Sequence, residues 1–542
     1  MRTAQSNIWL LALICTMVSC KKAIEDYPQE RLEEEEIFDP RDSVGTNSRQ
    51  FLMNVYAYLP NHFTGVGENA LQDAATDDAV YRYPAGTVET FVNGRWTSWN
   101  MPDDVWSRYY VGIRRANLFL SKVDIVPLKT AGQKDQWKAE ARFCRALFYF
   151  ELVRRWGGVP LLGNEVLTLE GNVDFTRNTF DQCIQYIVSE CDAVKDVLLR
   201  ENVIADGDWG RVTRTGALAL KARALLYAAS PLNNAGNDVT KWQAAAQAAK
   251  DIIDLNYHAL ATNFSTLFTT RRDKEIILNY QANTSSTLET NYGPIGYSGA
   301  SAGSGLMNPT QNLVEAFPMK NGKAITESGS GYDPQAPYTN RDPRLAATVL
   351  YNTLGWLNRP VELYDGGRDY AGTQTGYYMR KFLGAFTTST AYAATNHNAM
   401  IFRYAEVLLN YAEALCEANT LVPEEAYKAL ELIRQRAGLS PYTITRGLSQ
   451  AAFRTLVRNE RRVELAFEGH RFWDIRRWKI GAEVLNKTLL RGVAVTKTGT
   501  TYTYDAQRPV LTTSTWEDKL YRYPIPVAEI EKSKLLLQNT GW

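Results

Sequence analysis

The stretch RNERRVELAFEGHRFWDIRRWK, residues Arg458–Lys479, is the most informative part of this 542-residue chain. Eleven of its 22 residues are charged, and most of the others are aromatic or aliphatic. Glu460, Glu464 and Glu468 recur every four residues, which predicts a helix over Arg458–Gly469 with all three carboxylates on one face. Gly469 is expected to end this helix, because glycine tolerates positive φ.

The charges of this stretch predict an ion-pair network that ties a helix end to the rest of the fold. At the i,i+3 spacing Arg461 faces Glu464 and Arg471 reaches Glu468, but the carboxylates need further cations from outside the helix. The charged and aromatic residues that follow, from Arg471 to Trp478, are expected to form a turn. Catalytic acids are the alternative interpretation of the carboxylates, but carboxylates beside arginines are usually structural pairs.

The first residues of the chain resemble the signal segment of a bacterial lipoprotein. Arg2 precedes an apolar run, Ile8–Ile14, that is too short to span a bilayer. The sequence MVSC that ends at Cys20 is similar to a lipobox, in which the cysteine is acylated and the chain is cut just before it. We therefore expect a signal peptide over residues 1–19, lipidation of Cys20 and a tether over residues 20–40. An ordinary secretory signal with an incidental cysteine is the alternative.

Composition excludes some partners and favours others. The formal net charge of +1 argues against nucleic acid and against an anionic membrane surface. The chain holds 13 Trp and 30 Tyr, residues that favour surfaces which stack on sugars or other flat apolar faces. Four further cysteines lie in helical patterns and are expected to be small core residues rather than a disulfide or metal framework: Cys144, Cys183, Cys191 and Cys416.

Helical periodicity dominates the chain outside its centre. Small residues at facing positions suit close packing of paired antiparallel helices, as in tetratricopeptide (TPR) solenoids. The fold class predicted is mainly α, a TPR-like scaffold of helical pairs with a loop-rich region of few short strands. The periodic segments are Trp137–Trp156, Thr179–Leu199, Arg214–Ala229, Lys241–Leu255, Phe402–Ala418 and Pro423–Gly438.

The centre of the chain differs in composition and in apolar periodicity. Over residues 264–399 the helical periodicity of apolar residues is lost, and glycine, asparagine, serine, threonine and tyrosine become frequent. We expect one compact globule with an N-terminal helical part at residues 41–260 and a C-terminal part at residues 261–542 that contains this insert. Loops on a rigid scaffold are where binding usually resides.

Several short strings together resemble the SusD/RagB family, surface lipoproteins of Bacteroidetes-type bacteria that bind nutrients. Besides Arg458–Lys479, they are EARFCRALFYFELVRRWGGVPLL (Glu140–Leu162), NRDPRL (Asn340–Leu345), GYYMRKF (Gly376–Phe382), RYAEVLLNYAEAL (Arg403–Leu415) and the closing YPIPVAEI and LLQNTGW. The resemblance implies a SusD-like fold that spans most of the chain. It also implies a lid-like position over a SusC-like TonB-dependent transporter of the outer membrane.

Catalysis and metal binding find weak support in the sequence. Gly299–Gly303 matches the G-x-S-x-G nucleophile elbow around Ser301, but turn formers flank it where a strand and a helix are required. Asp77-Asp78, or the pair Asp206 and Asp208, could hold a structural calcium ion, although Asp-Gly turns are far commoner. We predict no catalytic residue, no other metal site and no cofactor.

Non-catalytic binding of a glycan is the function that these features favour. Aromatic rings stack on the C–H faces of sugars, and Asn, Asp, Arg and Lys bind the hydroxyls. The candidate ligand residues are Tyr81, Asn93, Arg95, Trp96 and Trp99 in one segment, and Tyr292 and Tyr297 in the central loops. The resemblance makes Trp96 the best match to a ligand-contacting aromatic, with a packed core residue as the alternative for each ring.

The expected protein is a lipid-anchored, cell-surface subunit that captures oligosaccharide for uptake and breaks no bonds. Because RagB-like members are associated with peptide uptake, a peptide-binding subunit is the alternative. A peptide site needs backbone-pairing edges and pockets rather than an aromatic platform.

Overall fold

The computed structural model describes residues 34–83, 86–168, 171, 174–384, 386, 390–485, 490–510 and 516–542. The predicted signal peptide, Cys20 and most of the predicted tether lie outside the described residues.

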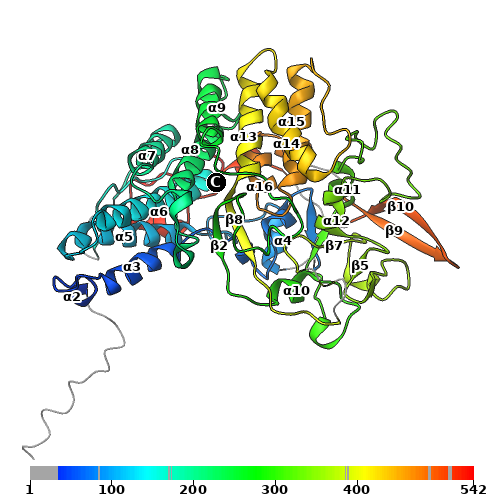
Figure 1. Cartoon of the computed structure of the whole chain (residues 1–542), viewed down its shortest axis with the longest axis horizontal. Coiled ribbons are helices and arrows are strands. Elements are labelled where there is room, and N and C mark those ends of the chain that lie inside the picture. Colours follow the sequence, from blue (N-terminus) through cyan, green and yellow to red (C-terminus); the bar gives the residue numbers. More distant parts are fainter. Residues whose placement is uncertain are drawn as a thin grey trace, which may run out of the picture.

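Long helices pack side by side into one curved array, in which most helices lie against the next one along the chain (Figure 1). The array confirms the mainly α, TPR-like prediction. Short 3-10 helices and the four-residue α2 (Glu34–Ile37) precede or link the helices of the array. In chain order the long helices are α3 (Thr46–Tyr56), α5 (Trp106–Lys122), α6 (Gln133–Trp156), α7 (Phe180–Val194), α8 (Arg214–Ala229), α9 (Val239–Ile253), α13 (Tyr404–Ala418), α14 (Glu424–Ala437) and α15 (Gln450–Glu464).

Local sequence explains where these helices begin, end and approach one another. Thr179 and Gln182 form a capping box at the start of α7, which satisfies free N–H groups of its first turn. Gly438 ends α14 in the left-handed conformation with φ 84°. Helix α8 is buried on nearly every side, and its alanines let α7 and α9 approach closely. The four described cysteines are buried free thiols, as the sequence predicts.

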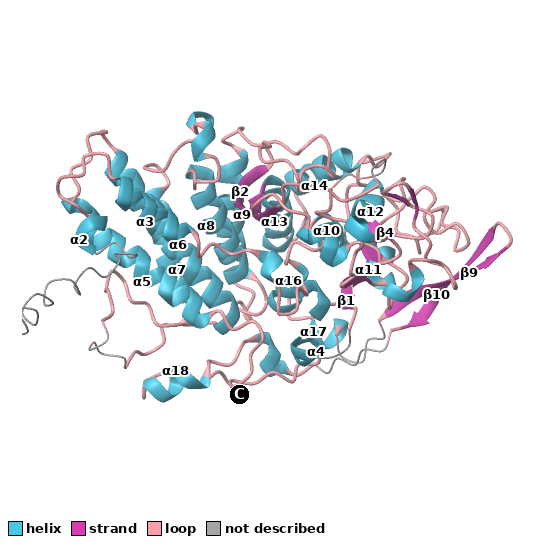
Figure 2. Ribbon diagram, turned by 90° about the horizontal axis from the view of Figure 1, so that it is seen from below, coloured by secondary structure: helices cyan, strands magenta, loops and turns pink. Residues whose placement is uncertain are grey.

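The loop-rich insert leaves the array after α9 and returns to it at α13. These two helices pack directly against each other although residues 254–403 separate them in the sequence. At the base of the insert, strand β2 (Ile276–Gln281) pairs antiparallel with β8 (Asn398–Arg403), so the outgoing and returning chains lie side by side (Figure 2). The insert therefore stands on the helical array at a closed base.

Apart from β2 and β8, the described strands form antiparallel pairs that are mostly very short. The pair of β9 (Arg491–Thr498) and β10 (Thr501–Pro509) is a long hairpin that projects from the body of the molecule (Figure 1). The other pairs are β1 (Ala79–Tyr81) with β3 (Met307–Pro309), β4 (Val349–Leu350) with β7 (Tyr378–Met379), and β5 (Gly355–Trp356) with β6 (Arg359–Pro360). The short helices are α4 (Gly86–Val92), α10 (Thr287–Tyr292), α11 (Gln311–Ala316), α12 (Pro343–Thr348), α16 (Arg471–Arg477), α17 (Gly481–Val484) and α18 (Val527–Lys532).

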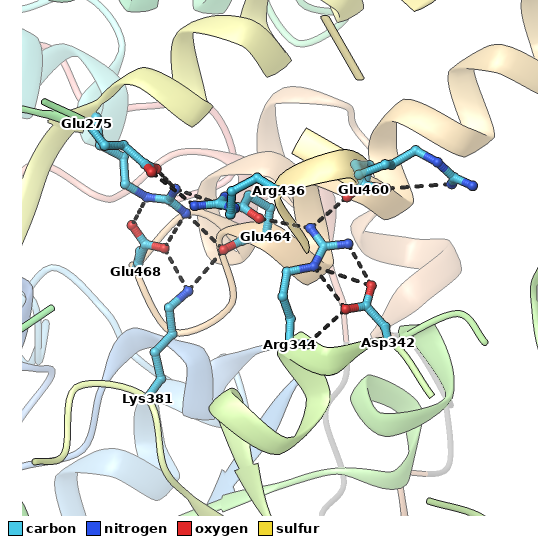
Figure 3. Close-up of polar contacts among 10 residues, drawn as sticks. Glu275, Asp342, Arg344, Lys381, Arg436, Glu460, Glu464 and Glu468 are labelled. Carbon is cyan, nitrogen blue, oxygen red and sulfur yellow. Dashed lines mark hydrogen bonds and ion pairs between the residues drawn. The ribbon is translucent and has the colours of Figure 1, made fainter. Parts of the chain in front are cut away.

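The predicted ion-pair network is present, and cations from several elements converge on Glu464 and Glu468 (Figure 3). Arg403, at the end of β8, donates to Glu464 at 2.7 Å and to both oxygens of Glu468 at 2.7 Å. Arg344 of α12 reaches Glu464 at 2.8 Å, and Arg436 of α14 binds the same carboxylate. The network, which we call the Glu464 cluster, therefore joins the helical array to the insert.

The Glu464 cluster keeps its carboxylates ionised although they are buried. Burial alone raises the pKa of Glu464, but the guanidinium groups of Arg436, Arg403 and Arg344 hold that pKa well below its usual range. Burial likewise opposes ionisation of Glu468, whose pKa Arg403 and Lys381 lower. A buried charge of this kind is tolerated only when it is paired and hydrogen-bonded.

The Arg458–Lys479 stretch itself differs from the prediction in its element boundaries. Helix α15 begins at Gln450, where the Ser449 hydroxyl caps it, and ends at Glu464. Phe467 has φ 64°, so the helix breaks before Gly469, which lies in the turn that follows. The residues predicted to form a charged turn form the buried helix α16.

The two predicted local ion pairs are also wrong. Arg461 binds Asp474 at 2.8 Å, and Arg471 binds Asp77 at 2.8 Å. Glu464 and Glu468 instead face cations that other elements bring to them, because the chain turns after Glu464 and directs the arginines of α15 and α16 elsewhere.

Replacing Glu464 with Gln should destabilise the whole fold. The variant leaves the guanidinium groups of Arg403 and Arg436 short of a counter-charge, and breaking a buried pair in this way lowers the free energy of unfolding by about 3–5 kcal/mol. Because the pKa of Glu464 is depressed in the folded state, its stabilisation is full above the unfolded value of about 4.3 and declines as the pH falls below it. Urea denaturation followed by circular dichroism at pH 7 and at low pH measures both effects.

The matched control is Asp254→Asn, which removes the exposed partner of Lys250 at the end of α9. This exposed pair should contribute little, so the control should unfold like the wild type. Equal stability of the two variants at pH 7 would contradict a structural role for the Glu464 cluster.

Candidate functional site

Trp99 is presented to solvent by a short turn between α4 and α5. Its indole side chain is 75% exposed. Asn100 Oδ1 accepts hydrogen bonds from the backbone N–H of Thr97 at 2.7 Å and from its hydroxyl at 2.8 Å, and that hydroxyl accepts from the N–H of Trp99 at 3.2 Å. The carbonyl of Ser98 accepts from the N–H of Val527 at 3.1 Å, which fastens the turn to α18. The ring is therefore exposed but held on an ordered backbone.

Next to this turn lies a hollow of about 640 Å³, which we call the Trp542 hollow. It brings together three of the predicted ligand residues with a segment from the far end of the chain. Its lining consists of Asn93, Gly94, Arg95, Trp96, Thr97, Ser98, Glu517, Lys519, Gly541 and Trp542.

The lining offers hydrogen-bonding groups of both kinds. The side chain of Asn93 is 9% exposed, and its Nδ2 donates to Glu89 at 2.6 Å, whereas its Oδ1 accepts from no group in the described part of the chain. Arg95 is exposed at the rim, and Lys519 Nζ lies 5.1 Å from the ring centroid of Trp542. A ligand with hydroxyl groups could donate to Asn93 and accept from the two cations.

Trp96 does not have the position that a stacking platform requires. Trp96 is 2% exposed. The centroid of its ring lies 4.8 Å from that of Trp542 and 5.0 Å from that of Tyr523. The expectation of an exposed platform at Trp96 is therefore corrected, because neighbouring rings cover it. Trp542, which lines the hollow above it, was not among the predicted residues, although the closing string LLQNTGW contains it.

Tyr81 and Tyr292 hold a loop instead of facing the hollow. Their hydroxyls donate to the adjacent carbonyls of Glu68 at 3.0 Å and Asn69 at 2.9 Å, two residues with positive φ. Both rings are buried, and burial raises the pKa of each phenol. They therefore offer no free ring to a ligand, which corrects the prediction for both.

Tyr297 belongs to a different part of the central loops. Its hydroxyl donates to the carbonyl of Trp356 at 2.7 Å, and the guanidinium of Arg359 lies 3.8 Å from its ring centroid. Among the described residues, the lining of the Trp542 hollow includes Asn93, Arg95 and Trp96 but none of the three tyrosines. A ligand role for the half-buried Tyr297 stays a prediction.

The catalytic and metal-binding candidates have other partners. Ser301 lies in a single turn of 3-10 helix, and its hydroxyl donates to the carbonyl of Thr390 at 2.5 Å. Asp77 and Asp78 bind Arg471 and Arg462, and Asp206 and Asp208 also pair with arginines. Across the described ranges, no group of three or more His, Cys, Asp or Glu side chains is placed to hold a metal ion.

Comparison with known proteins assigns the family. Residues 274–542 match the SusD family, and residues 33–226 match a SusD-like family described as starch-binding and associating with the outer membrane. The chain belongs to the SusD/RagB family. The two matched regions of this SusD-like protein lie on either side of the division predicted near residue 260, which itself stays a prediction.

Similar proteins cover nearly the whole length of the SusD-like chain. SusD-like protein P25 of Formosa agariphila is 25% identical over an alignment 519 positions long, which covers 89% of this chain and 91% of P25. The solved structure of a SusD-like protein from Bacteroides fragilis is 28% identical, with a TM-score of 0.79 over 95% of this chain and 99% of that one. Another structure from that organism, a SusD-like carbohydrate binding protein, is 25% identical, with a TM-score of 0.73 over 91% and 99% of the two chains.

In the described residues of the SusD-like chain, no helix is long and apolar enough to cross a membrane.

Removing the buried ring of Trp96 should destabilise the protein. Trp96→Ala leaves a cavity between Trp542 and Tyr523, so we expect the free energy of unfolding to fall by about 3–5 kcal/mol in urea denaturation. Trp99→Ala is the matched control, since its exposed ring should contribute little to stability. A Trp96→Ala variant as stable as Trp99→Ala would contradict the packing described here.

Proposed function

We propose that this chain is a lipid-anchored cell-surface protein that captures oligosaccharide and delivers it to a SusC-like TonB-dependent transporter. Trp99 and the Trp542 hollow form the proposed binding site. The family and its starch-binding, outer-membrane description support the proposal, as does the carbohydrate-binding relative from Bacteroides fragilis.

The observation that carries the proposal is an exposed, backbone-fixed indole beside a polar hollow. One face of a pyranose carries mainly C–H groups, and these can lie against the ring of Trp99. A sugar hydroxyl can then donate to Asn93 Oδ1, while Arg95 and Lys519 donate to hydroxyl oxygens. Such a site recognises a chain of sugars by one ring contact and several hydrogen bonds.

The chemistry of the hollow supports binding without cleavage. Hydrolysis of a glycosidic bond generally needs two carboxyl groups on opposite sides of the bond. The side chains that line the described part of the hollow include one carboxylate, Glu517, which pairs with Lys519 at 3.0 Å. A ligand bound here would leave intact, which suits a protein that delivers it to a transporter.

The helical array suits the partner role. Solenoid-like arrays present large, continuous faces to other proteins, so we propose that the array contacts the transporter. The glycan site lies on the segment between α4 and α5 and on the C-terminal segment.

Trp99→Ala should weaken glycan binding without unfolding the protein. Loss of a central Trp contact typically reduces affinity by about tenfold or more. Isothermal titration calorimetry with malto-oligosaccharides and β-glucan oligosaccharides measures the change for whichever glycan the wild type binds. Trp99→Phe is the matched control, because it keeps an aromatic face and should lose less affinity.

Two outcomes would overturn this proposal. Unchanged affinity of Trp99→Ala for a glycan that the wild type binds would remove Trp99 from the site. If the glycan panel is silent while peptide pools bind, the peptide-uptake alternative replaces glycan capture.

Cys20→Ala should release the protein from membranes. The acylated cysteine is the proposed anchor, so the variant should move from the detergent phase to the aqueous phase in Triton X-114 partitioning of expressing cells. Cys15→Ala is the control: Cys15 lies just after the apolar run that the signal peptidase would remove, and this variant should stay in the detergent phase. Retention of Cys20→Ala in the detergent phase would refute the lipobox.

A further inference from the structure

A second pocket lies between the start of α8 and strand β2, and it shares no described lining residue with the Trp542 hollow. Its volume is about 270 Å³, compared with about 30 Å³ for one water molecule in the liquid. We call it the Trp209 pocket. It is lined by Glu201, Ile204, Trp209, Gly210, Arg211, Thr213, Tyr257, His258, Arg272, Asp273, Lys274 and Ile276–Asn279.

His258 offers this pocket a hydrogen-bond acceptor. The residue is 8% exposed, and its Nδ1 lies 2.7 Å from the carbonyl oxygen of Lys274. Because a carbonyl can only accept, Nδ1 carries the proton and Nε2 has a free lone pair. Burial lowers the pKa of His258, so the ring stays neutral at physiological pH. In the described structure Nε2 has no hydrogen-bond partner.

Asn279 offers the pocket a donor. Its side chain is 3% exposed, and its Nδ2 is without a partner among the residues described. Asn279 and Gln281 pair in regular register with β8, so their side chains share one face of β2. Gln281 reaches the carbonyl of Trp209 at 3.4 Å, which identifies that face as the side of the Trp209 pocket.

Two aromatic side chains form fixed walls. The indole N–H of Trp209 donates to the carbonyl of Arg271 at 2.6 Å, and the hydroxyl of Tyr257 donates to the carbonyl of Glu201 at 2.8 Å. Ile204 and Ile276 add aliphatic surface. The pocket thus combines flat apolar walls with two buried polar atoms that await a partner.

Both arginines at this pocket are already paired. Arg272 binds Asp206, and Arg211 binds Glu140 and Asp208. A phosphate monoester would find these guanidinium groups neutralised, and its dianion has no proton to give to His258 Nε2. Hydroxyl groups of a ligand can satisfy both unpaired atoms, since a hydroxyl can donate to Nε2 and a hydroxyl oxygen can accept from Asn279 Nδ2.

We infer that the Trp209 pocket binds a neutral, polyhydroxylated molecule of about monosaccharide size, as a site separate from the Trp542 hollow. Hydroxyl groups of the ligand bind His258 and Asn279, and its C–H surface lies against Trp209 and Tyr257. This inference does not depend on oligosaccharide capture at Trp99.

The test uses the full chain and a panel of neutral hexoses and pentoses, with binding measured by saturation-transfer NMR and calorimetry. Asn279→Leu keeps the size of the side chain but removes the donor, so we expect binding of the responding sugar to weaken by about tenfold or more. The same substitution removes an unpaired buried amide, so the melting temperature should stay equal or rise. Trp209→Ala should also weaken binding, and Trp99→Ala should leave it unchanged.

Crystals soaked in the responding sugar provide an independent readout, with sugar density expected within hydrogen-bond distance of His258 Nε2 and Asn279 Nδ2. Silence of the whole panel, or density for ordered water only, overturns the inference. The inference is also overturned if Trp99→Ala abolishes binding whereas Asn279→Leu and Trp209→Ala do not change it. The sugar would then occupy the Trp542 hollow. Failure of oligosaccharide capture at Trp99 alone would refute the proposed function but not this site.

Discussion

The contact between Arg403 and the carboxylates of Glu464 and Glu468 is the interaction on which the rest of the structure depends. Arg403 stands where the returning strand of the insert becomes helix α13, and both carboxylates stand where α15 ends and turns toward α16. The side chains involved are at most 1% exposed. At that depth an unpaired charge is strongly unfavourable, so the insert, α13 and α15 must meet in one arrangement for the charges to be satisfied.

Sequence predicted the helical array well because its signals are local. Periodic apolar positions define a helix, and capping residues such as Thr179 and Gly438 set its ends, through contacts between residues only a few positions apart. The existence of an ion-pair network could also be predicted, because three carboxylates on one face of a helix are stable only with cations nearby. Its members could not, because Arg344, Arg403 and Arg436 come from elements far apart in sequence. The β9–β10 hairpin was missed although alternating Tyr502 and Tyr504 follow a turn at Gly499.

The candidate site shows the same division between local and distant information. The segment from Asn93 to Trp99 was identified from its composition, and three of its predicted residues do line one hollow. Composition cannot tell which ring of a Trp-rich segment is buried, because that depends on which side chains from distant parts of the chain pack against it. Trp542 and Tyr523 cover Trp96, whereas a turn held by Asn100 leaves Trp99 in solvent. The same reasoning explains why Tyr81 and Tyr292 turned out to fasten a loop.

The closed base of the insert has a consequence for how such proteins can diversify. Residues 254–403 leave and rejoin the array at neighbouring points, where β2 pairs with β8 and α9 packs on α13. For a loop whose ends are held together, each doubling of length changes the closure free energy by only about 0.6 kcal/mol. Insertions and deletions that spare the residues holding the insert to the array, such as Arg344 and Arg403, therefore perturb the array little. The architecture separates loops whose length natural variation can change from the array and the buried insert residues that it must preserve.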